Sequence, residues 1–213
     1  MTYQRIPEPS PRDRKLNIEK ALMGIFPEED LGFIAEVLSF ASSRRVIQYS
    51  EIDVPEAVKE DLLILLERER VLIPFNTSKT IAWEDRLLSF LPDERYELPH
   101  VVSNMLKRAG QNSRLEPSLA LKDYLVEIGE TKPEHTVSLM ENVLTDVENG
   151  KITAEALSRA AKELSMESRM GTIIAVLKAG GVISPCLRNP STLRYEVNPF
   201  FTKCILRKKP SNV

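Results

Sequence analysis

The chain has 213 residues, of which 42% are hydrophobic and 28% charged, and its formal net charge at pH 7 is −2. This balance is typical of a globular protein with one large or two small domains, and it excludes a wholly disordered chain. Residues 1–15 are polar, and no apolar run approaches the roughly 20 residues of a membrane helix. We therefore expect a cytoplasmic protein that has a flexible arm over residues 1–15 and does not enter a membrane.

Residues 16–95 predict helices followed by a β-hairpin. Leu31, Ile34 and Leu38 share one face at helical spacing, and acidic residues after Pro27 favour the start of that helix. The expected elements are helices over 16–25, 27–43 and 56–70, a short strand over 46–49, a short helix over 49–54, and hairpin strands over 71–75 and 80–83. These elements form the first expected domain.

Residues 96–130 predict a helical connector. One helix covers 98–109 and ends before Gly110, and another covers 119–128 and ends before Gly129. Glycine often follows the C-terminus of a helix because it adopts a left-handed backbone conformation at little cost. We expect the connector to pack against both ends of the chain.

Residues 131–201 repeat the order of elements seen in the first domain. The expected elements are helices over 133–147, 153–164 and 166–179, and strands over 182–184 and 193–197. Thr153 and Ser165 are predicted to cap the second and third helices, because their hydroxyls can accept backbone hydrogen bonds. Residues 202–213 form a basic tail.

This C-terminal pattern resembles the winged-helix superfamily. The segments GKITAEALSRAAKEL, SMESRMGTIIAVLKAGGVISP and LRYEVNP follow the order of a helix-turn-helix and a two-stranded wing. Residues 133–199 fit this outline well, and residues 30–84 fit it more loosely. The resemblance implies a mainly α fold with small β-hairpin wings, in which the connector joins two winged-helix domains. A tandem winged-helix protein of prokaryotic type is expected to bind DNA and regulate transcription.

The distribution of charge supports the same interpretation. Residues 151–213 contain eleven Lys and Arg against four Glu, a local charge of +7, whereas the remainder of the chain carries −9. Such asymmetry indicates that one end meets a polyanion. The alternative is a chance distribution of solvated charges.

The predicted DNA contacts lie on the third helix, the wing and the tail of the C-terminal domain. They are Ser168, Arg169, Thr172, Arg188, Arg194, Lys203, Arg207, Lys208 and Lys209. The helix residues would reach base edges in the major groove, and the basic residues of the wing and tail would attract phosphates. The alternative for Arg169 and for the tail is a solvent-facing charge without a partner.

The corresponding helix of the first domain, residues 57–70, has a net charge of −1 and predicts a different role. Its acidic residues would be repelled by phosphates, so we interpret this domain as a protein contact. Trp83 is either an interface anchor or a core residue. The alternative function is therefore a non-catalytic scaffold of tandem winged-helix modules with a protein partner, or a homodimer.

Residue types that carry catalysis or bind metals are sparse. His100 and His135 lie in different predicted helices, and Cys186 and Cys204 are most simply reduced thiols. There is no CxxC or HExxH pattern, no glycine-rich phosphate loop and no GxSxG motif. We therefore expect no bound metal, no cofactor and no enzymatic activity.

Overall fold

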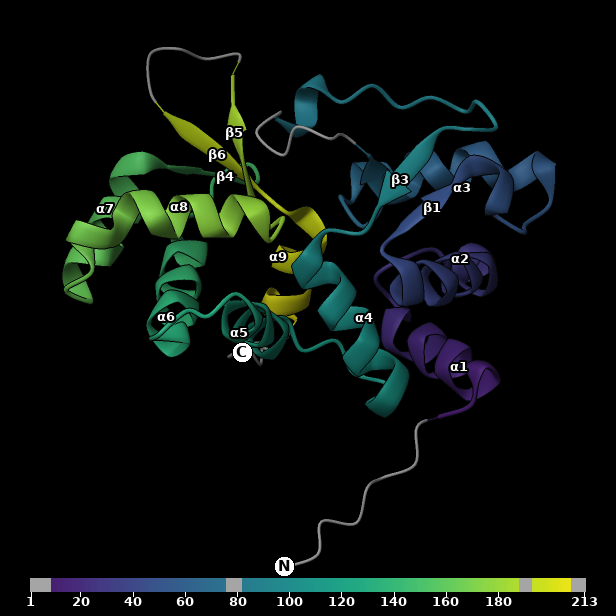
Figure 1. The fold of residues 1–213 in the computed structure, drawn as a ribbon, viewed down its shortest axis with the longest axis horizontal. Helices are drawn as coiled ribbons and strands as arrows, with labels where there is room; N and C mark the ends of the chain where they lie inside the picture. Colours follow the sequence, from purple (N-terminus) through teal and green to yellow (C-terminus); the bar gives the residue numbers. More distant parts are fainter. Residues whose placement is uncertain (1–8, 76–81, 188–192, 208–213) are drawn as a thin grey trace, which may run out of the picture.

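The computed structural model describes residues 9–75, 82–187 and 193–207. The described chain is mainly helical, with two small three-stranded antiparallel sheets (Figure 1). We call residues 9–97 the N-terminal half and residues 133–207 the C-terminal half, and each half contains one of the sheets. Within the described ranges, no helix is both long and apolar enough to cross a membrane.

The N-terminal half places helices around a sheet whose central strand comes last in the sequence. Its elements are α1 (Pro11–Leu22), α2 (Leu31–Arg44), β1 (Val46–Gln48), a 3₁₀ helix (Tyr49–Glu51), α3 (Glu56–Arg68), β2 (Ile73–Pro74) and β3 (Arg95–Glu97). The strand order is β1-β3-β2, and Tyr96 of β3 lies opposite both Ile47 and Pro74. Because Tyr96 is 0% exposed, this central pairing is also part of the core.

The C-terminal half is built in the same order. Its elements are α6 (Pro133–Val143), β4 (Lys151–Thr153), α7 (Ala154–Glu163), α8 (Met170–Ala179), β5 (Ile183–Cys186), β6 (Arg194–Val197) and α9 (Pro199–Leu206). The strand order is β4-β6-β5, so the last strand is again central and pairs with the first. The two halves therefore share one order of elements: a helix, a strand, a second helix, a third helix and two strands. The second helix is the 3₁₀ helix Tyr49–Glu51 in the N-terminal half and α7 in the C-terminal half.

Two helices lie between the halves where helices were predicted, α4 (His100–Asn112) and α5 (Pro117–Glu127). The predicted end of the first helix before Gly110 is wrong, because α4 continues through Gly110. Both helices lie in the middle of the molecule together with α9 (Figure 1). Buried residues from both halves and from these central helices form one hydrophobic core. Phe26 and Phe200 illustrate this continuity, because their rings stack with centroids 6.0 Å apart.

Polar contacts also join the two halves. Glu69, which follows α3, accepts a hydrogen bond from Lys203 Nζ at 2.6 Å, and its carbonyl accepts one from the Phe200 amide at 3.3 Å. Arg70 Nε contacts Glu196 Oε1 of β6 at 3.2 Å. These contacts link residues more than 120 positions apart, so they fix the position of one sheet relative to the other.

Several predicted boundaries are wrong. The first helix begins at Pro11 rather than Leu16, because Ser10 caps it by accepting a hydrogen bond from the Asp13 amide. The predicted arm therefore overlaps α1 at residues 11–15, and residues 1–8 lie outside the described chain. The predicted tail overlaps α9, which continues to Leu206.

The predicted second strand of the N-terminal hairpin is also misplaced. Trp83–Asp85 is a 3₁₀ helix, and the partner of β2 is β3, at residues 95–97. Residues 80 and 81 lie outside the described chain. The error arises because the loop between the strands is about twenty residues long, so no short turn marks the register of the pair.

In the C-terminal half, Thr153 caps α7 as predicted by accepting a hydrogen bond from the Ala156 amide at 3.1 Å. Ser165 does not cap α8. It has a φ of 53° and lies in the turn after α7, and a 3₁₀ turn over Glu167–Arg169 separates it from the start of α8 at Met170.

Candidate nucleic-acid interface

The outer surface of α8 is small and uncharged. Its exposed residues are Gly171, Thr172, Ala175 and Ala179. Ile173 and Leu177, on the opposite side of α8, are 1% and 0% exposed and anchor the helix in the core. Ser168, in the 3₁₀ turn before α8, is exposed as well. The Thr172 hydroxyl is thus available on a helix that contains no carboxylate, whereas the Ser168 hydroxyl lies beside the exposed carboxylate of Glu167 in the preceding turn.

Arg169 is committed to an internal ion pair. Its Nη2 donates a hydrogen bond to Glu130 Oε2 at 2.6 Å, and the Glu130 side chain is 6% exposed. The hydrogen bond from Arg169, together with the backbone amide of Lys132, lowers the pKa of Glu130 to about 2. Arg169 thus joins the start of α8 to the segment before α6, and its charge is already balanced.

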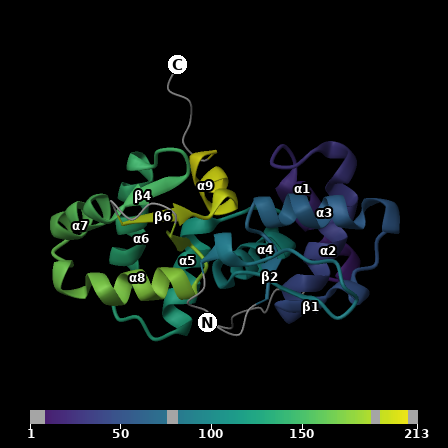
Figure 2. The ribbon, with the colours of Figure 1, turned by 90° about the horizontal axis from the view of Figure 1, so that it is seen from above.

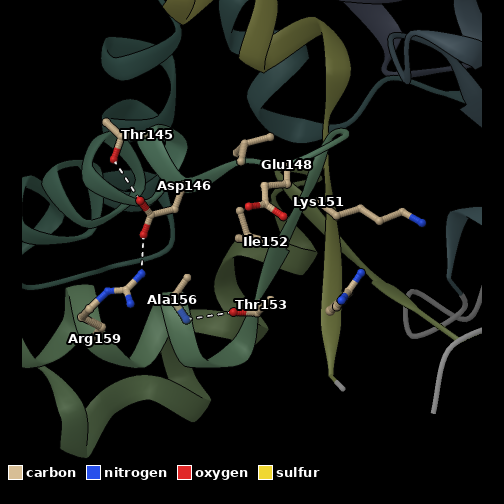
Figure 3. A pocket seen from close by; sticks show the side chains of 10 residues that line it. Thr145, Asp146, Glu148, Lys151, Ile152, Thr153, Ala156 and Arg159 are labelled. Carbon is tan, nitrogen blue, oxygen red and sulfur yellow. Dashed lines mark hydrogen bonds and ion pairs between the residues drawn. The ribbon is translucent and has the colours of Figure 1, made fainter. Parts of the chain in front are cut away.

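A charged pocket of ≈ 400 Å³ lies beside the sheet of the C-terminal half. Its walls come from residues 145–148, which follow α6, from β4 and from the first turns of α7, and Arg194 of β6 completes them. Arg159 Nη2 donates a hydrogen bond to Asp146 Oδ2 at 2.6 Å on one side, and Lys151 extends from the other side (Figure 3). Besides this ion pair, the pocket is lined by the carboxylate of Glu148 and by two cations, Lys151 and Arg194.

The register of the sheet explains why Lys151 and Arg194 lie on the same face. Thr153 is opposite Arg194, and Lys151 is opposite Glu196, so alternate residues of β4 and β6 point to the outer face of the sheet. In the described chain neither Lys151 nor Arg194 pairs with a carboxylate. Both are exposed, so together they can attract a phosphate group.

Lys151 was not among the predicted contacts, although the sequence contains a signal for its position. Asn149 and Gly150 have φ values of 51° and 73°, and Glu148 and Lys151 exchange backbone hydrogen bonds of 3.0 Å across them. An Asn-Gly pair is the strongest short-range indication of such a tight turn. This turn sets the start of β4 and hence the face on which Lys151 lies.

The structure does not bring all the predicted contacts together. Figure 2 shows α8 on one side of the C-terminal half and β4 on the other. None of Ser168, Arg169 and Thr172 lines the pocket that contains Arg194. The helix surface and the pocket are therefore two separate surfaces, one neutral and one charged.

The predicted tail contacts are partly engaged elsewhere. Lys203 lies in α9 and pairs with Glu69, and Arg207 Nη1 donates a hydrogen bond to the carbonyl of Met23 at 3.0 Å. Both cations therefore stabilise the packing of α9 against the N-terminal half. Arg188, Lys208 and Lys209 lie outside the described residues.

Trp83 is an internal residue rather than an exposed anchor, because it is 4% exposed. Its backbone amide donates a hydrogen bond of 3.0 Å to Ser184 Oγ of β5, and Arg70 lies over its ring at 5.7 Å from the centroid. The contact it makes is between the two halves of the same chain. The core interpretation of Trp83 is the correct one.

The surface of α3, which occupies the position of α8 in the N-terminal half, is acidic. Its exposed residues are Glu56, Ala57, Glu60, Asp61, Ile64 and Arg68. Carboxylates on this surface would repel phosphates. The two equivalent helices therefore differ in charge, and only α8 is electrostatically compatible with a polyanion.

In the described part of the chain, no group of three or more His, Cys, Asp and Glu residues could hold a metal ion.

Comparisons with known proteins add one finding. Neither a curated protein nor a solved structure matches the chain. Residues 16–208 match the model of a protein family that is uncharacterised. Since this match spans most of the sequence, the chain belongs to that family.

Proposed function

We propose that this protein binds double-stranded DNA through its C-terminal half and acts as a prokaryotic transcription regulator. In this proposal each half is a winged-helix domain, with α3 and α8 as the third helices and the last two strands of each sheet as the wing. The shared order of elements supports this interpretation. So does the strand order of both sheets, in which the first strand pairs with the last.

The observation that carries the proposal is the difference between α8 and α3. A helix enters the major groove only if its exposed surface is narrow and does not repel the flanking phosphates. The outer residues of α8 are small and neutral, and hydroxyls at Ser168 and Thr172 can hydrogen-bond to base edges. Lys151 and Arg194 would add phosphate attraction from the outer face of the sheet.

The test is a fluorescence-anisotropy titration of the full chain against random duplex DNA at low and at moderate salt. We expect affinity to fall steeply with salt, as it does for proteins that displace counterions from DNA. The double variant Lys151→Ala/Arg194→Ala should flatten the slope of log affinity against log salt by about 1.8, if each residue contacts one phosphate. Absence of binding at low salt would reject the proposal.

A charge-matched control separates local contacts from net charge. Arg12 and Lys107 are exposed on α1 and α4, far from the sheet of the C-terminal half in the sequence. The double variant Arg12→Ala/Lys107→Ala removes the same two charges and should leave the salt slope unchanged. An equal loss in both double variants would indicate only a general effect of charge.

A second candidate function is a protein scaffold, and the acidic surface of α3 favours it. Ile64 is 47% exposed among the carboxylates of that surface, an arrangement that suits a protein partner better than DNA. This function predicts a stable heteromeric complex on pull-down at high salt, weakened by Ile64→Asp. A clean monomer that still shifts DNA would count against it.

A further inference from the structure

A small cavity of ≈ 20 Å³ lies where the two halves and the start of α4 meet. Its lining includes three cationic side chains from distant positions: Arg45 at the end of α2, Arg86 after the Trp83 turn, and Lys178 near the end of α8. Glu97 of β3 and His100 of α4 complete the charged part of the lining. This cavity shares no lining residue with the charged pocket, and it adjoins the C-terminal end of α8, where Ala179 lines it.

Two hydrogen-bond donors of this cavity's lining have no partner. The Nε atoms of Arg45 and Arg86 are buried and lack a hydrogen-bond acceptor among the described residues. Only two other buried side-chain atoms of the described chain, Ser103 Oγ and Thr136 Oγ1, share this state. A buried donor without a partner destabilises the folded state, more so when it is charged, and calls for a bound water or ion.

The backbone of Arg45 and the side chain of Arg86 are both held in place. Arg45 has a φ of 67°, its amide donates a hydrogen bond to Ala41, and its carbonyl accepts one from Leu98. The Arg86 side chain is 6% exposed and is held by Glu97 Oε1 at 2.8 Å and by the carbonyl of Pro74 at 3.1 Å. These contacts use the Nη1 atom of Arg86 and leave its Nε without an acceptor.

The charge of the lining does not balance. Arg45, Arg86 and Lys178 carry three positive charges, and within the described residues only Arg86 has a carboxylate partner. His100 supplies no negative charge, because an imidazole is either neutral or cationic. Its Nε2 contacts Glu127 Oε2 at 3.0 Å. Burial is the main cause that lowers the pKa of His100, and the nearby charge of Arg45 lowers it further, whereas Glu127 raises it.

We propose that this cavity binds one small monovalent anion of the size of chloride, between the guanidinium groups of Arg45 and Arg86. A cavity of this volume holds about one water-sized particle, so a halide fits and a bulky organic anion does not. A water molecule could accept the same hydrogen bonds, but it would leave the excess charge uncompensated. Arg45 and Arg86 both belong to the N-terminal half, and Lys178 of α8 lines the same cavity, so the anion also attracts the end of α8 and stabilises the junction.

The first test compares thermal unfolding of the full chain in sodium chloride and in sodium gluconate at equal ionic strength. Chloride that binds only the folded state should raise Tm by about 2–4 °C and then saturate. Arg45→Gln should abolish this difference. The matched control is Arg44→Gln, because Arg44 is the neighbouring exposed residue and pairs with Glu51, so this variant should keep the full chloride response.

The second test is independent of any variant. Crystals of the wild-type chain soaked in sodium bromide should show an anomalous difference peak between the side chains of Arg45 and Arg86. The proposal would be overturned by equal Tm values in the two salts or by an undiminished chloride response in Arg45→Gln. An electron-density peak at this position without anomalous signal would also overturn it. The last result would identify a water molecule as the occupant.

Discussion

The side-chain amide of Asn198 donates a hydrogen bond of 3.0 Å to the backbone carbonyl of Arg70, which lies 128 residues earlier in the chain. The same amide donates to the carbonyl of Gly181 at 3.1 Å, and Asn198 Oδ1 accepts a hydrogen bond from the Phe201 amide. Asn198 is 0% exposed. One buried side chain therefore caps α9 and ties the end of α3 to the end of α8.

Replacement of Asn198 should destabilise the whole chain. Asn198→Ala leaves two buried carbonyl groups without donors and removes a helix cap, for an expected loss of about 2–4 kcal/mol in the free energy of unfolding. Asn198→Asp keeps the cap acceptor but loses both donors, and it should be destabilising as well. Denaturant unfolding followed by circular dichroism and by Trp83 fluorescence measures the change.

The control for Asn198 is Asn142→Ala, because Asn142 is exposed on α6. This change should alter stability by less than about 0.5 kcal/mol. Because the core is continuous across both halves, the two spectroscopic probes should report the same midpoint in every variant. Separate midpoints would show that the halves unfold independently, contrary to the packing described above.

A side chain at Gly181 should disrupt the junction where Pro99 precedes α4. Gly181 has a φ of 72°, and a Cβ at this position would lie 2.4 Å from the Cβ of Pro99. Gly129 has a φ of 78° and no atom within 4 Å of an added Cβ. Gly129→Ala should therefore show only the backbone penalty of about 1–2 kcal/mol, and Gly181→Ala should lose about 1–3 kcal/mol more. Equal losses in the two variants would contradict the close approach.

Local patterns predicted much of the fold, and long-range pairings account for what they missed. The spacing of Leu31, Ile34 and Leu38 identified α2, and Thr153 marked the start of α7, because both signals act within a few residues. The pairing of β3 with β1 and β2 depends on segments separated by about twenty to fifty residues, and no local turn specifies it. The sequence pattern therefore places the partner strand of β2 at residues 80–83, which are closer to β2 along the chain than β3 is.

The candidate site illustrates the same limit. Thr172 is exposed on α8 as helical periodicity predicts, and Ser168 is exposed in the turn before that helix. The partners of Arg169 and Lys203, however, lie 39 and 134 residues away. A count of charges along the sequence takes both cations as available to a ligand, because it does not show which carboxylates they pair with in the folded chain. The excess of +7 in the C-terminal end therefore overstates the charge that is available to a ligand.

The ion pair between Arg169 and Glu130 should make stability depend on pH below about 4.5. The pKa of Glu130 falls from an ordinary 4.5 to about 2 in the folded state, so the stabilisation is complete above 4.5. It is lost as the pH falls from 4.5 to 2, where the carboxylate becomes protonated in the folded state too. Because Arg169 is about one-third exposed, we expect the pair to contribute on the order of 2 kcal/mol rather than the full shift.

Arg169→Gln tests this prediction through the free energy of unfolding at several pH values. The difference from the wild type should be largest near pH 7 and should vanish toward pH 2. Arg159→Gln is the matched control, since its pair with Asp146 has side chains that are 64% and 43% exposed. That pair should contribute less than about 1 kcal/mol. A difference for Arg169→Gln that does not depend on pH would refute the assignment.

A negative charge introduced on α8 should weaken DNA binding without affecting the folding of the protein. Ala175 lies in the middle of the exposed face of α8, and Ala57 is an exposed alanine on the equivalent helix α3. Ala175→Glu places a carboxylate where the groove would lie, and it should weaken DNA binding by at least roughly tenfold through repulsion of the phosphates. Ala57→Glu makes the same chemical change on the acidic surface of the N-terminal half and should leave the affinity unchanged.

Both glutamate variants are exposed helical substitutions, so their far-ultraviolet circular dichroism and midpoints of unfolding should match those of the wild type. The anisotropy titration then distinguishes the two candidate surfaces. Loss of binding in Ala175→Glu but not in Lys151→Ala/Arg194→Ala would assign the contact to α8, and the reverse would assign it to the charged pocket. If the wild type binds DNA and neither change affects it, the C-terminal half is not the DNA-binding surface.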